Sequence, residues 1–100
     1  MVRVRLEFSG GLELLFGNQK ECEVDVPVAS GQQELTAGHL ILWARDNMLQ
    51  ERPELFVKGN SVRPGILVLI NECDWELCGA GESTISEGDH VVFISTLHGG

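Results

Sequence analysis

The residues best suited to metal binding or nucleophilic chemistry are three cysteines, Cys22, Cys73 and Cys78, and three histidines with no metal-ligand spacing. Four residues separate Cys73 from Cys78, so the pair matches neither a redox Cys-x-x-Cys motif nor a zinc motif. A catalytic cysteine also needs a base, and nothing in the sequence places His90 beside a thiol. We expect buried or half-buried thiols in a reducing compartment and no metal site. Their response to oxidants is left open.

Acidic side chains alternate along residues 21–25 and again along residues 72–76. Such rows of carboxylates could hold a metal ion or act as an acid–base pair, but a solvated acidic face is the commoner explanation. The glycine pairs in the chain match no phosphate-binding fingerprint. The sequence therefore predicts no active site of its own, and an acidic face that favours a basic partner.

Charge narrows the possible partners. The chain has 100 residues, with 15 acidic side chains against 7 Lys and Arg, and a formal charge of −8. Nucleic acids and anionic membranes require cations, so we expect the chain to bind neither directly. No apolar stretch is long enough to span a membrane, and the alternating N-terminus is not a signal peptide. We expect a monomer in the cytoplasm, with the nucleus as a second compartment.

Apolar residues at strand spacing predict extended structure in several segments: residues 2–8, 12–16, 21–28, 55–57, 66–70, 75–78 and 90–94. Residues 2–8 and 12–16 are expected to pair as an N-terminal hairpin across a glycine turn. Residues 66–70 are apolar on both faces, which predicts a central strand. One strand-rich domain follows from this pattern.

One helix is predicted between Thr36, a candidate N-cap, and Pro53. Its apolar stripe consists of Leu40, Ile41, Ala44 and Met48. A single helix covers only one face of a sheet, so the sequence favours an α+β fold with a curved mixed β-sheet packed on one main α-helix. Placing the first and last strands side by side gives the β-grasp, or ubiquitin-like, arrangement. We expect a domain over residues 1–94 and a flexible tail over residues 95–100.

The sequence ends in Gly99-Gly100 shortly after an apolar strand. Six extended residues reach about 20 Å, far enough to enter the active-site channel of another protein. Glycines lack Cβ, so a narrow channel can close around the backbone beside the terminal carboxylate. A frayed terminus is the plain alternative. Combined with the β-grasp pattern, the two glycines indicate a terminal group on which another enzyme acts.

Several segments match a known family: ERPELF (51–56), SVRPGILVLIN (61–71), DWEL (74–77) and VFISTLHGG (92–100). With them, the sequence closely resembles the eukaryotic ubiquitin-related modifiers, the ubiquitin-like proteins that double as sulfur carriers. The likeness covers nearly the whole chain, and residues 20–38 depart most from it. The Gly-Asp-x-Val pattern at residues 88–91 is also similar to the prokaryotic sulfur carriers of molybdopterin and thiamine synthesis.

The resemblance implies a carrier, acted on by an enzyme and not itself one, whose reacting group is Gly100. An activating enzyme of the ubiquitin-activating type would use ATP and Mg²⁺ to adenylate Gly100, and a rhodanese-type persulfide would displace AMP. The resulting thiocarboxylate would give its sulfur to tRNA wobble uridines through a separate thiolase complex. The resemblance also implies conjugation to lysines of target proteins and no cofactor bound to the carrier. The alternatives are a modifier only, or a β-grasp interaction module with an inert tail.

A docking surface follows from the strand periodicity. If Val91 and Phe93 face the helix, their neighbours on the last strand face outward. The predicted contact with the activating enzyme consists of apolar side chains on this strand, on the tail and on the strand at 66–70: Val92, Ile94, Leu97, Leu67 and Leu69. The alternative is that a loop of the same chain covers them. His98 stands where ubiquitin has an arginine, and we expect it to weaken recognition by ubiquitin's own enzymes.

Overall fold

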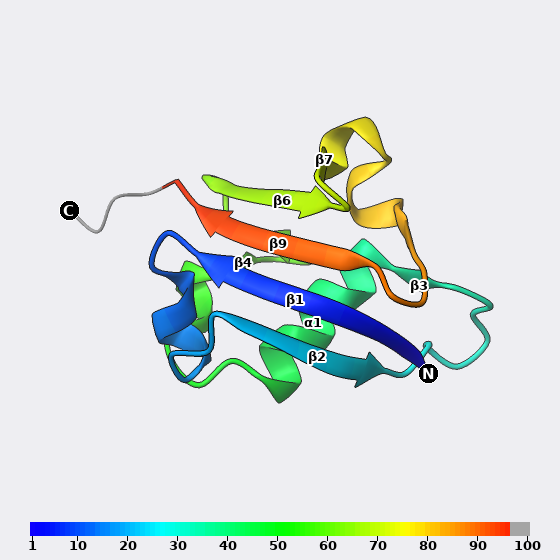
Figure 1. The fold of residues 1–100 in the computed structure, drawn as a ribbon, viewed down its shortest axis with the longest axis horizontal. Helices are drawn as coiled ribbons and strands as arrows, with labels where there is room; N and C mark the ends of the chain where they lie inside the picture. Colours follow the sequence, from blue (N-terminus) through cyan, green and yellow to red (C-terminus); the bar gives the residue numbers. More distant parts are fainter. Residues whose placement is uncertain (97–100) are drawn as a thin grey trace.

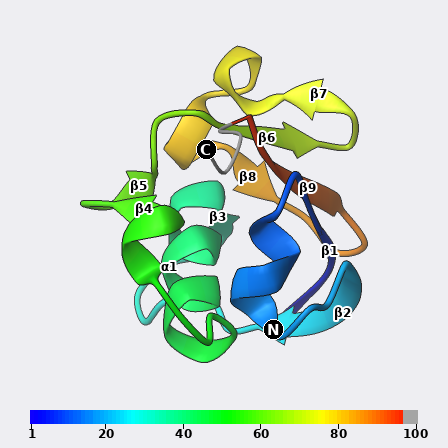
Figure 2. The same cartoon turned by 90° about the vertical axis from the view of Figure 1, so that its left-hand side faces the viewer.

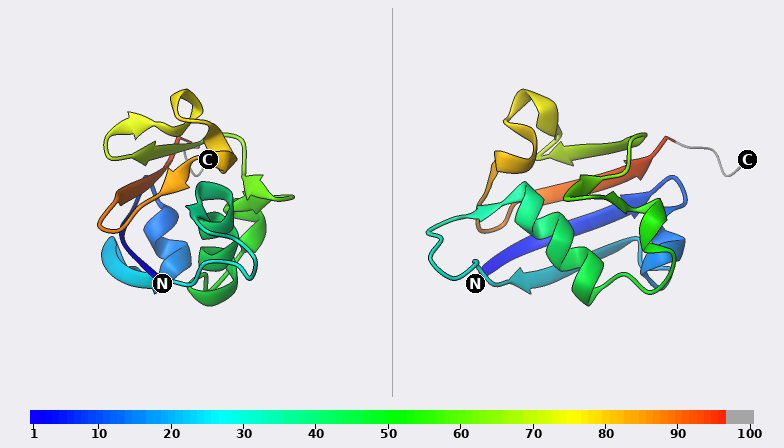
Figure 3. Two further views of the ribbon diagram at one scale, coloured as in Figure 1. Left: turned by 90° about the vertical axis from the view of Figure 1, so that its right-hand side faces the viewer. Right: turned by 180° about the vertical axis from the view of Figure 1, so that it is seen from behind.

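The computed structural model describes residues 1–96 of the chain. A twisted five-stranded sheet forms one layer, and the helix α1 (Ala37–Asn47) packs across one of its faces (Figures 1 and 3). The strands of this sheet are β1 (Val2–Ser9), β2 (Glu21–Val26), β6 (Ile66–Ile70), β7 (Cys73–Asp74) and β9 (His90–Ser95). Their order across the sheet is β2-β1-β9-β6-β7.

The first and last strands of the chain lie side by side, as predicted. β1 and β9 are parallel, whereas β1 pairs with β2, β6 with β9 and β6 with β7 in antiparallel fashion. The mixed sheet on one main helix confirms the predicted α+β fold. β6 is an interior strand between β9 and β7, as predicted, and β9 lies in the middle of the sheet.

Shorter elements close the ends of the two layers (Figure 2). They are the paired strands β3 (Leu35–Thr36) and β8 (Thr84–Ile85), the paired strands β4 (Val57–Lys58) and β5 (Ser61–Val62), and the 3₁₀ helices η1 (Leu12–Phe16), η2 (Pro53–Leu55), η3 (Trp75–Leu77) and η4 (Ala80–Glu82). Within residues 1–96, no helix has both the length and the hydropathy needed to cross a membrane.

The helix begins at the predicted cap. The Thr36 hydroxyl accepts a hydrogen bond of 3.2 Å from the His39 N–H, which satisfies one of the free donors of the first turn. Leu40, Ile41 and Ala44 of the predicted stripe are fully buried against the sheet. The helix therefore buries the face that its apolar spacing predicts.

Four phenylalanines form the centre of the core between the two layers. Phe8 stacks on Phe16 with 4.0 Å between ring centroids, and Phe56 meets Phe93 edge to face at 5.5 Å. All four are at most 1% exposed. Phe8 lies on β1 and Phe16 on η1, while Phe56 directly precedes β4 and Phe93 lies on β9. The aromatic core therefore packs the first strand against the last.

The prediction that residues 12–16 form a strand is wrong, because they form the 3₁₀ helix η1. The hairpin partner of β1 is instead β2. Gly11 and Gly17 bracket η1 with positive φ values of 101° and 70°, and Leu14 points outward with 61% exposure while its apolar neighbours are buried. A five-residue apolar run between two glycines fits a strand and one helical turn equally well.

The segment after β6 also differs from the prediction. Residues 75–78 were expected to return as a strand, but Trp75–Leu77 is the 3₁₀ helix η3, and the returning strand is the short β7. Asn71 and Glu72 both have positive φ, so the chain reverses between β6 and β7. The acidic residues at 72–76 therefore do not line one face of a strand.

Candidate functional site

The end of β9 is held by hydrogen bonds to the turn before β6. Ser95 lies opposite Ile66 in the sheet, and the next residue, Thr96, donates its N–H to the Gly65 carbonyl at 2.9 Å. The Thr96 hydroxyl donates to the same carbonyl oxygen. The bonding between the end of β9 and the start of β6 therefore continues to Thr96, the last described residue. The domain boundary after residue 94 stays a prediction.

On its other side, the end of β9 meets the turn after β1. Gly10 has a φ of +71°, and a Cβ built on it would overlap the backbone carbonyl of Ser95. Only a residue without a side chain allows the two backbones to come this close. We call Gly10, Gly65 and Thr96 the tail exit, since together they determine where the chain leaves the sheet.

The predicted tail residues Leu97, His98, Gly99 and Gly100 lie outside the described residues. They remain candidate site residues on sequence grounds. Because Thr96 is anchored, four residues follow the exit, and four residues span at most about 14 Å. This limit is shorter than the reach of about 20 Å expected for a tail that starts at Ser95.

Beside the tail exit lie four apolar side chains on the sheet face opposite α1. Leu67 pairs with Ile94, and Leu69 pairs with Val92, so the four form one continuous group, which we call the apolar patch. Leu67, Leu69 and Ile94 are half-buried, but Val92 is only 8% exposed. β9 is the central strand, and Val92 lies between Leu69 and Glu7 on the neighbouring strands. Val92 therefore forms the floor of the patch rather than a projecting contact.

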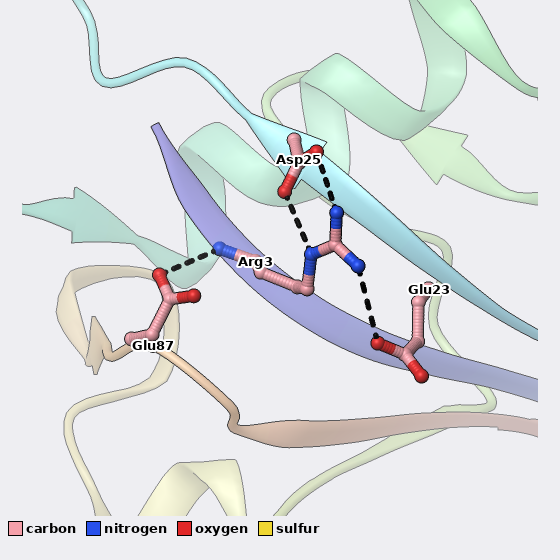
Figure 4. Close-up of polar contacts among 4 residues, drawn as sticks. All are labelled: Arg3, Glu23, Asp25 and Glu87. Atoms are coloured by element: carbon pink, nitrogen blue, oxygen red, sulfur yellow. Dashed lines mark hydrogen bonds and ion pairs between the residues drawn. The ribbon is translucent and has the colours of Figure 1, made fainter.

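Charged side chains continue the same sheet face across β1 and β2. Arg3 forms two hydrogen bonds with the Asp25 carboxylate, at 3.0 and 3.1 Å, and its Nη1 lies 3.7 Å from a Glu23 oxygen (Figure 4). The Arg3 backbone N–H donates to Glu87 at 3.0 Å. The hydrogen bonds with Asp25 raise the pKa of Arg3 above its ordinary value.

The next two residues of β1 that face this way are paired as well. Arg5 Nε lies 3.2 Å from Glu21, and Glu7 lies 3.2 Å from the His90 ring. The alternating acids predicted at residues 21–25 thus lie along β2 beside β1: Asp25 is opposite Arg3, Glu23 is opposite Arg5, and Glu21 is opposite Glu7 but contacts Arg5. Each of these two arginines is therefore engaged with carboxylates on this face.

The thiols fall into one isolated residue and one pair. Cys22 is half-buried on β2, and burial raises its pKa. Cys73 and Cys78 lie side by side, an arrangement that the spacing in the sequence did not reveal.

His90, which was considered as a base for a catalytic thiol, contacts the Glu7 carboxylate. In the part of the chain that the structure describes, no group of three or more His, Cys, Asp or Glu side chains could hold a metal ion.

A mixed sheet with parallel first and last strands, packed on one main helix and ending at a fixed tail exit, defines a ubiquitin-like β-grasp protein. A family model described as Urm1 (ubiquitin related modifier) matches residues 3–100. The chain therefore belongs to the Urm1 family of ubiquitin-related modifiers.

Individual relatives agree with this assignment. The chain is 81% identical over 100 residues to the ubiquitin-related modifier 1 homolog of Chlamydomonas reinhardtii, with the whole of both chains covered. It is 53% identical over 98 residues to ubiquitin-related modifier 1 of Homo sapiens, covering 97% of this chain and 94% of the human one. The solution structure of Urm1 from Trypanosoma brucei matches with a TM-score of 0.81 and 42% identity, covering 98% of this chain and 95% of that one.

Proposed function

We propose that this chain is a sulfur carrier for the 2-thiolation of tRNA wobble uridines, with the terminal carboxylate of Gly100 as its reacting group. Membership of the Urm1 family supports a carrier role. The observation that carries the proposal is the tail exit, because Thr96 is bonded to Gly65 and the preceding residue, Ser95, packs closely against the Gly10 backbone. The residues that end in Gly100 therefore start from a defined point beside the apolar patch.

The chemistry needs an activated terminus, since a free carboxylate has no good leaving group. An ATP-dependent activating enzyme would join Gly100 to AMP and release pyrophosphate, supplying Mg²⁺ and basic residues for the developing charge. The outer sulfur of a rhodanese-type persulfide then attacks the carbonyl carbon, and AMP leaves. A second thiol attacks the rhodanese sulfur of the resulting acyl disulfide, forms a disulfide with it and releases the thiocarboxylate on Gly100. The carrier binds no cofactor of its own in this scheme.

The apolar patch is the proposed contact for the activating enzyme, together with Leu97 of the tail. Apolar side chains that are partly exposed beside a functional terminus often mark a site where a partner protein binds. The tRNA is bound by the thiolase complex and not by the carrier, because the carrier has a formal charge of −8. We assign this chemistry to the cytoplasm, with the nucleus as a second compartment.

The same activated Gly100 can also acylate a lysine amine, which makes the chain a protein modifier. Family membership supports this second role, since relatives carry the name ubiquitin-related modifier. Both roles use one leaving group and differ only in the nucleophile, a persulfide sulfur or a lysine nitrogen. A module with an inert tail predicts that deletion of Gly99 and Gly100 leaves function intact, whereas either proposed role predicts complete loss.

A mass spectrum of the C-terminal peptide tests the carrier role. The protein is incubated with ATP, Mg²⁺, the activating enzyme of its own organism and a persulfide donor, and then treated with a thiol alkylating reagent. We expect one oxygen of Gly100 to be replaced by sulfur, and the new group to be alkylated. Alkylation distinguishes this exchange from addition of one oxygen to a side chain, which changes the mass by nearly the same amount.

The controls separate the possible outcomes. A chain that lacks Gly99 and Gly100 provides the background for the peptide analysis. An unmodified Gly100 from reagents that thiolate a known carrier would overturn the carrier role. A Gly100–lysine amide formed without any thiocarboxylate would assign the chain to protein modification alone.

His98 is expected to contribute to the choice of activating enzyme. The substitution His98→Arg introduces the longer, permanently charged side chain that ubiquitin carries there. We expect adenylation by the ubiquitin-activating enzyme to rise at least several-fold, measured by pyrophosphate release, while the fold is unchanged. The substitution His98→Gln is the uncharged control. Identical rates for all three chains would contradict this role.

A further inference from the structure

Two thiols far from the tail exit lie in contact on the edge of the sheet. The Cys78 thiol donates a hydrogen bond to the Cys73 sulfur, with 3.3 Å between the two sulfur atoms. Cys73 is half-buried on β7, and Cys78 is exposed directly after η3. This segment forms the yellow loop at the end of β6 opposite the C-terminus in Figure 1. The pair therefore belongs to a different region from the proposed carrier site.

The backbone between the two cysteines is held by local hydrogen bonds. Cys73 pairs with Ile70 in the sheet, which fixes one end of the turn. The Asp74 carboxylate accepts from the Glu76 N–H at 3.0 Å, and the Cys78 N–H donates to the Trp75 carbonyl at 2.9 Å. Trp75 is only 7% exposed, so η3 is anchored in the core. The sulfurs thus meet because the turn brings them together, and only a small shift separates them from bonding distance.

The third thiol, Cys22, is too distant to form a disulfide with either member of the pair. Cys22 lies on β2, and β2 and β7 are the two opposite edges of the five-stranded sheet. Neighbouring strands are about 4.8 Å apart, so four strand spacings put Cys22 roughly 19 Å from the pair. Within one molecule, Cys73 and Cys78 are therefore the pair of sulfurs that can join.

We propose that Cys73 and Cys78 form a redox-active dithiol that closes to an intramolecular disulfide by exchange with a small disulfide such as oxidised glutathione. The exposed Cys78, as thiolate, attacks one sulfur of the small disulfide, breaks its S–S bond and releases one thiolate. The Cys73 thiolate then attacks the Cys78 sulfur of the mixed disulfide and releases the second thiolate. The two protein thiols lose two electrons and two protons, and the small disulfide is reduced to two thiols.

The hydrogen bond between the thiols also affects the rate of this exchange. It holds the proton on Cys78 and raises the pKa of that thiol, which lowers its thiolate fraction at neutral pH. Closure is therefore slow with weak oxidants and becomes faster as the pH rises. Once a mixed disulfide forms on Cys78, the neighbouring Cys73 is already in position to complete the exchange.

The test equilibrates the full-length reduced protein with glutathione buffers of increasing oxidised fraction, at a total glutathione concentration well below the millimolar range. Free thiols are trapped by rapid alkylation, and intact mass and peptides are then measured. The effective concentration of one thiol beside another on a short linker is in the millimolar range. We therefore expect the intramolecular disulfide to exceed the mixed glutathione adduct by about tenfold or more, with Cys22 alkylated throughout.

Single variants identify the sulfurs. Cys78→Ser should abolish the intramolecular disulfide, Cys73→Ser should stop the reaction at the glutathione adduct on Cys78, and Cys22→Ser should close like the parent chain. Circular dichroism checks that each variant is folded. Three alkylated thiols at every buffer ratio would overturn the proposal. A persistent adduct on Cys78 in the parent chain, or a disulfide that includes Cys22, would also overturn it.

Discussion

Single residues determine where the tail leaves the sheet. Gly10 allows the β1–η1 turn to pack against Ser95, and Gly65 offers the carbonyl that receives two hydrogen bonds from Thr96. Neither glycine belongs to the terminal Gly-Gly motif that the sequence brings to attention. Their role depends on contacts between segments that are far apart in the sequence, so local spacing does not reveal it.

Substitution of Gly10 should therefore cost more stability than its backbone conformation alone explains. Gly10→Ala places a Cβ on the Ser95 carbonyl at a φ of +71°. We expect a loss of roughly 2–4 kcal/mol in the free energy of unfolding, measured by urea denaturation, from a left-handed alanine plus overpacking.

Gly59→Ala is the matched control for this prediction. Gly59 has a similar φ of +64°, but a Cβ there meets nothing within 4 Å. Only the backbone cost of about 1–2 kcal/mol applies at this position. Equal losses for the two variants would mean that the contact between Gly10 and Ser95 adds nothing to stability.

The thiol pair gives a pH-dependent prediction at the same scale. The hydrogen bond to Cys73 raises the pKa of Cys78, because it stabilises the protonated thiol. Cys73→Ala removes the acceptor, so the midpoint of Cys78 alkylation against pH should move to lower pH. The rate is followed by mass spectrometry of the peptide that contains Cys78. Cys22→Ala should leave the midpoint in place, and an unchanged or higher midpoint in Cys73→Ala would show that the hydrogen bond does not raise this pKa.

At the scale of elements, the longer segments and the apolar run at residues 66–70 were predicted correctly, whereas the apolar runs at 12–16 and 75–78 were not. The alternation of β1 and the stripe of α1 each involve enough residues to select one period. Residues 12–16 and 75–78 are too short for that choice, and both contain 3₁₀ helices, η1 and η3. Residues with positive φ near the ends of these segments turn the chain away from an extended path. A pattern of apolar residues carries no information about φ, so it could not predict these turns. The four residues of the apolar patch could be assigned to one sheet face because successive side chains of a strand point to opposite faces.

The start of α1 provides a direct test of how an element begins. Thr36→Ala removes the hydroxyl that accepts from the His39 N–H, and we expect a loss of about 1 kcal/mol in the free energy of unfolding. Thr36→Ser keeps the oxygen and should restore most of this stability. If Ser and Ala were equally destabilising in thermal or urea unfolding, the lost methyl group and not the cap would be responsible.

At the scale of the whole molecule, the sheet separates two kinds of surface on its outer face. β1 and β2 carry paired charges, whereas β6 and β9 carry the apolar patch beside the tail exit. Because the chain carries a formal charge of −8, a partner with an apolar centre and a basic rim fits this face best. The family could be identified from sequence alone, but the burial of Val92 required the order of the strands.

The apolar patch gives the prediction that belongs to this scale. Leu69→Glu places a carboxylate on the patch, so we expect the KM of the activating enzyme for the carrier to rise about tenfold or more, with kcat nearly unchanged. Leu14→Glu is the control, because Leu14 is 61% exposed on η1 and lies outside the patch. Equal effects of both variants would mean that added charge, and not the patch, determines binding.

The central position of β9 has a consequence for how the chain folds during synthesis. β1 and β2 can pair early, and β6 and β7 later, but the two halves of the sheet remain separate until β9 enters between β1 and β6. β9 follows the other described strands in the sequence, so the sheet closes only after β9 has been synthesised. A ribosome-bound or truncated chain lacks this closure. Formation of the tail exit is thus coupled to completion of the fold, and an activating enzyme that requires both the patch and the tail selects finished molecules.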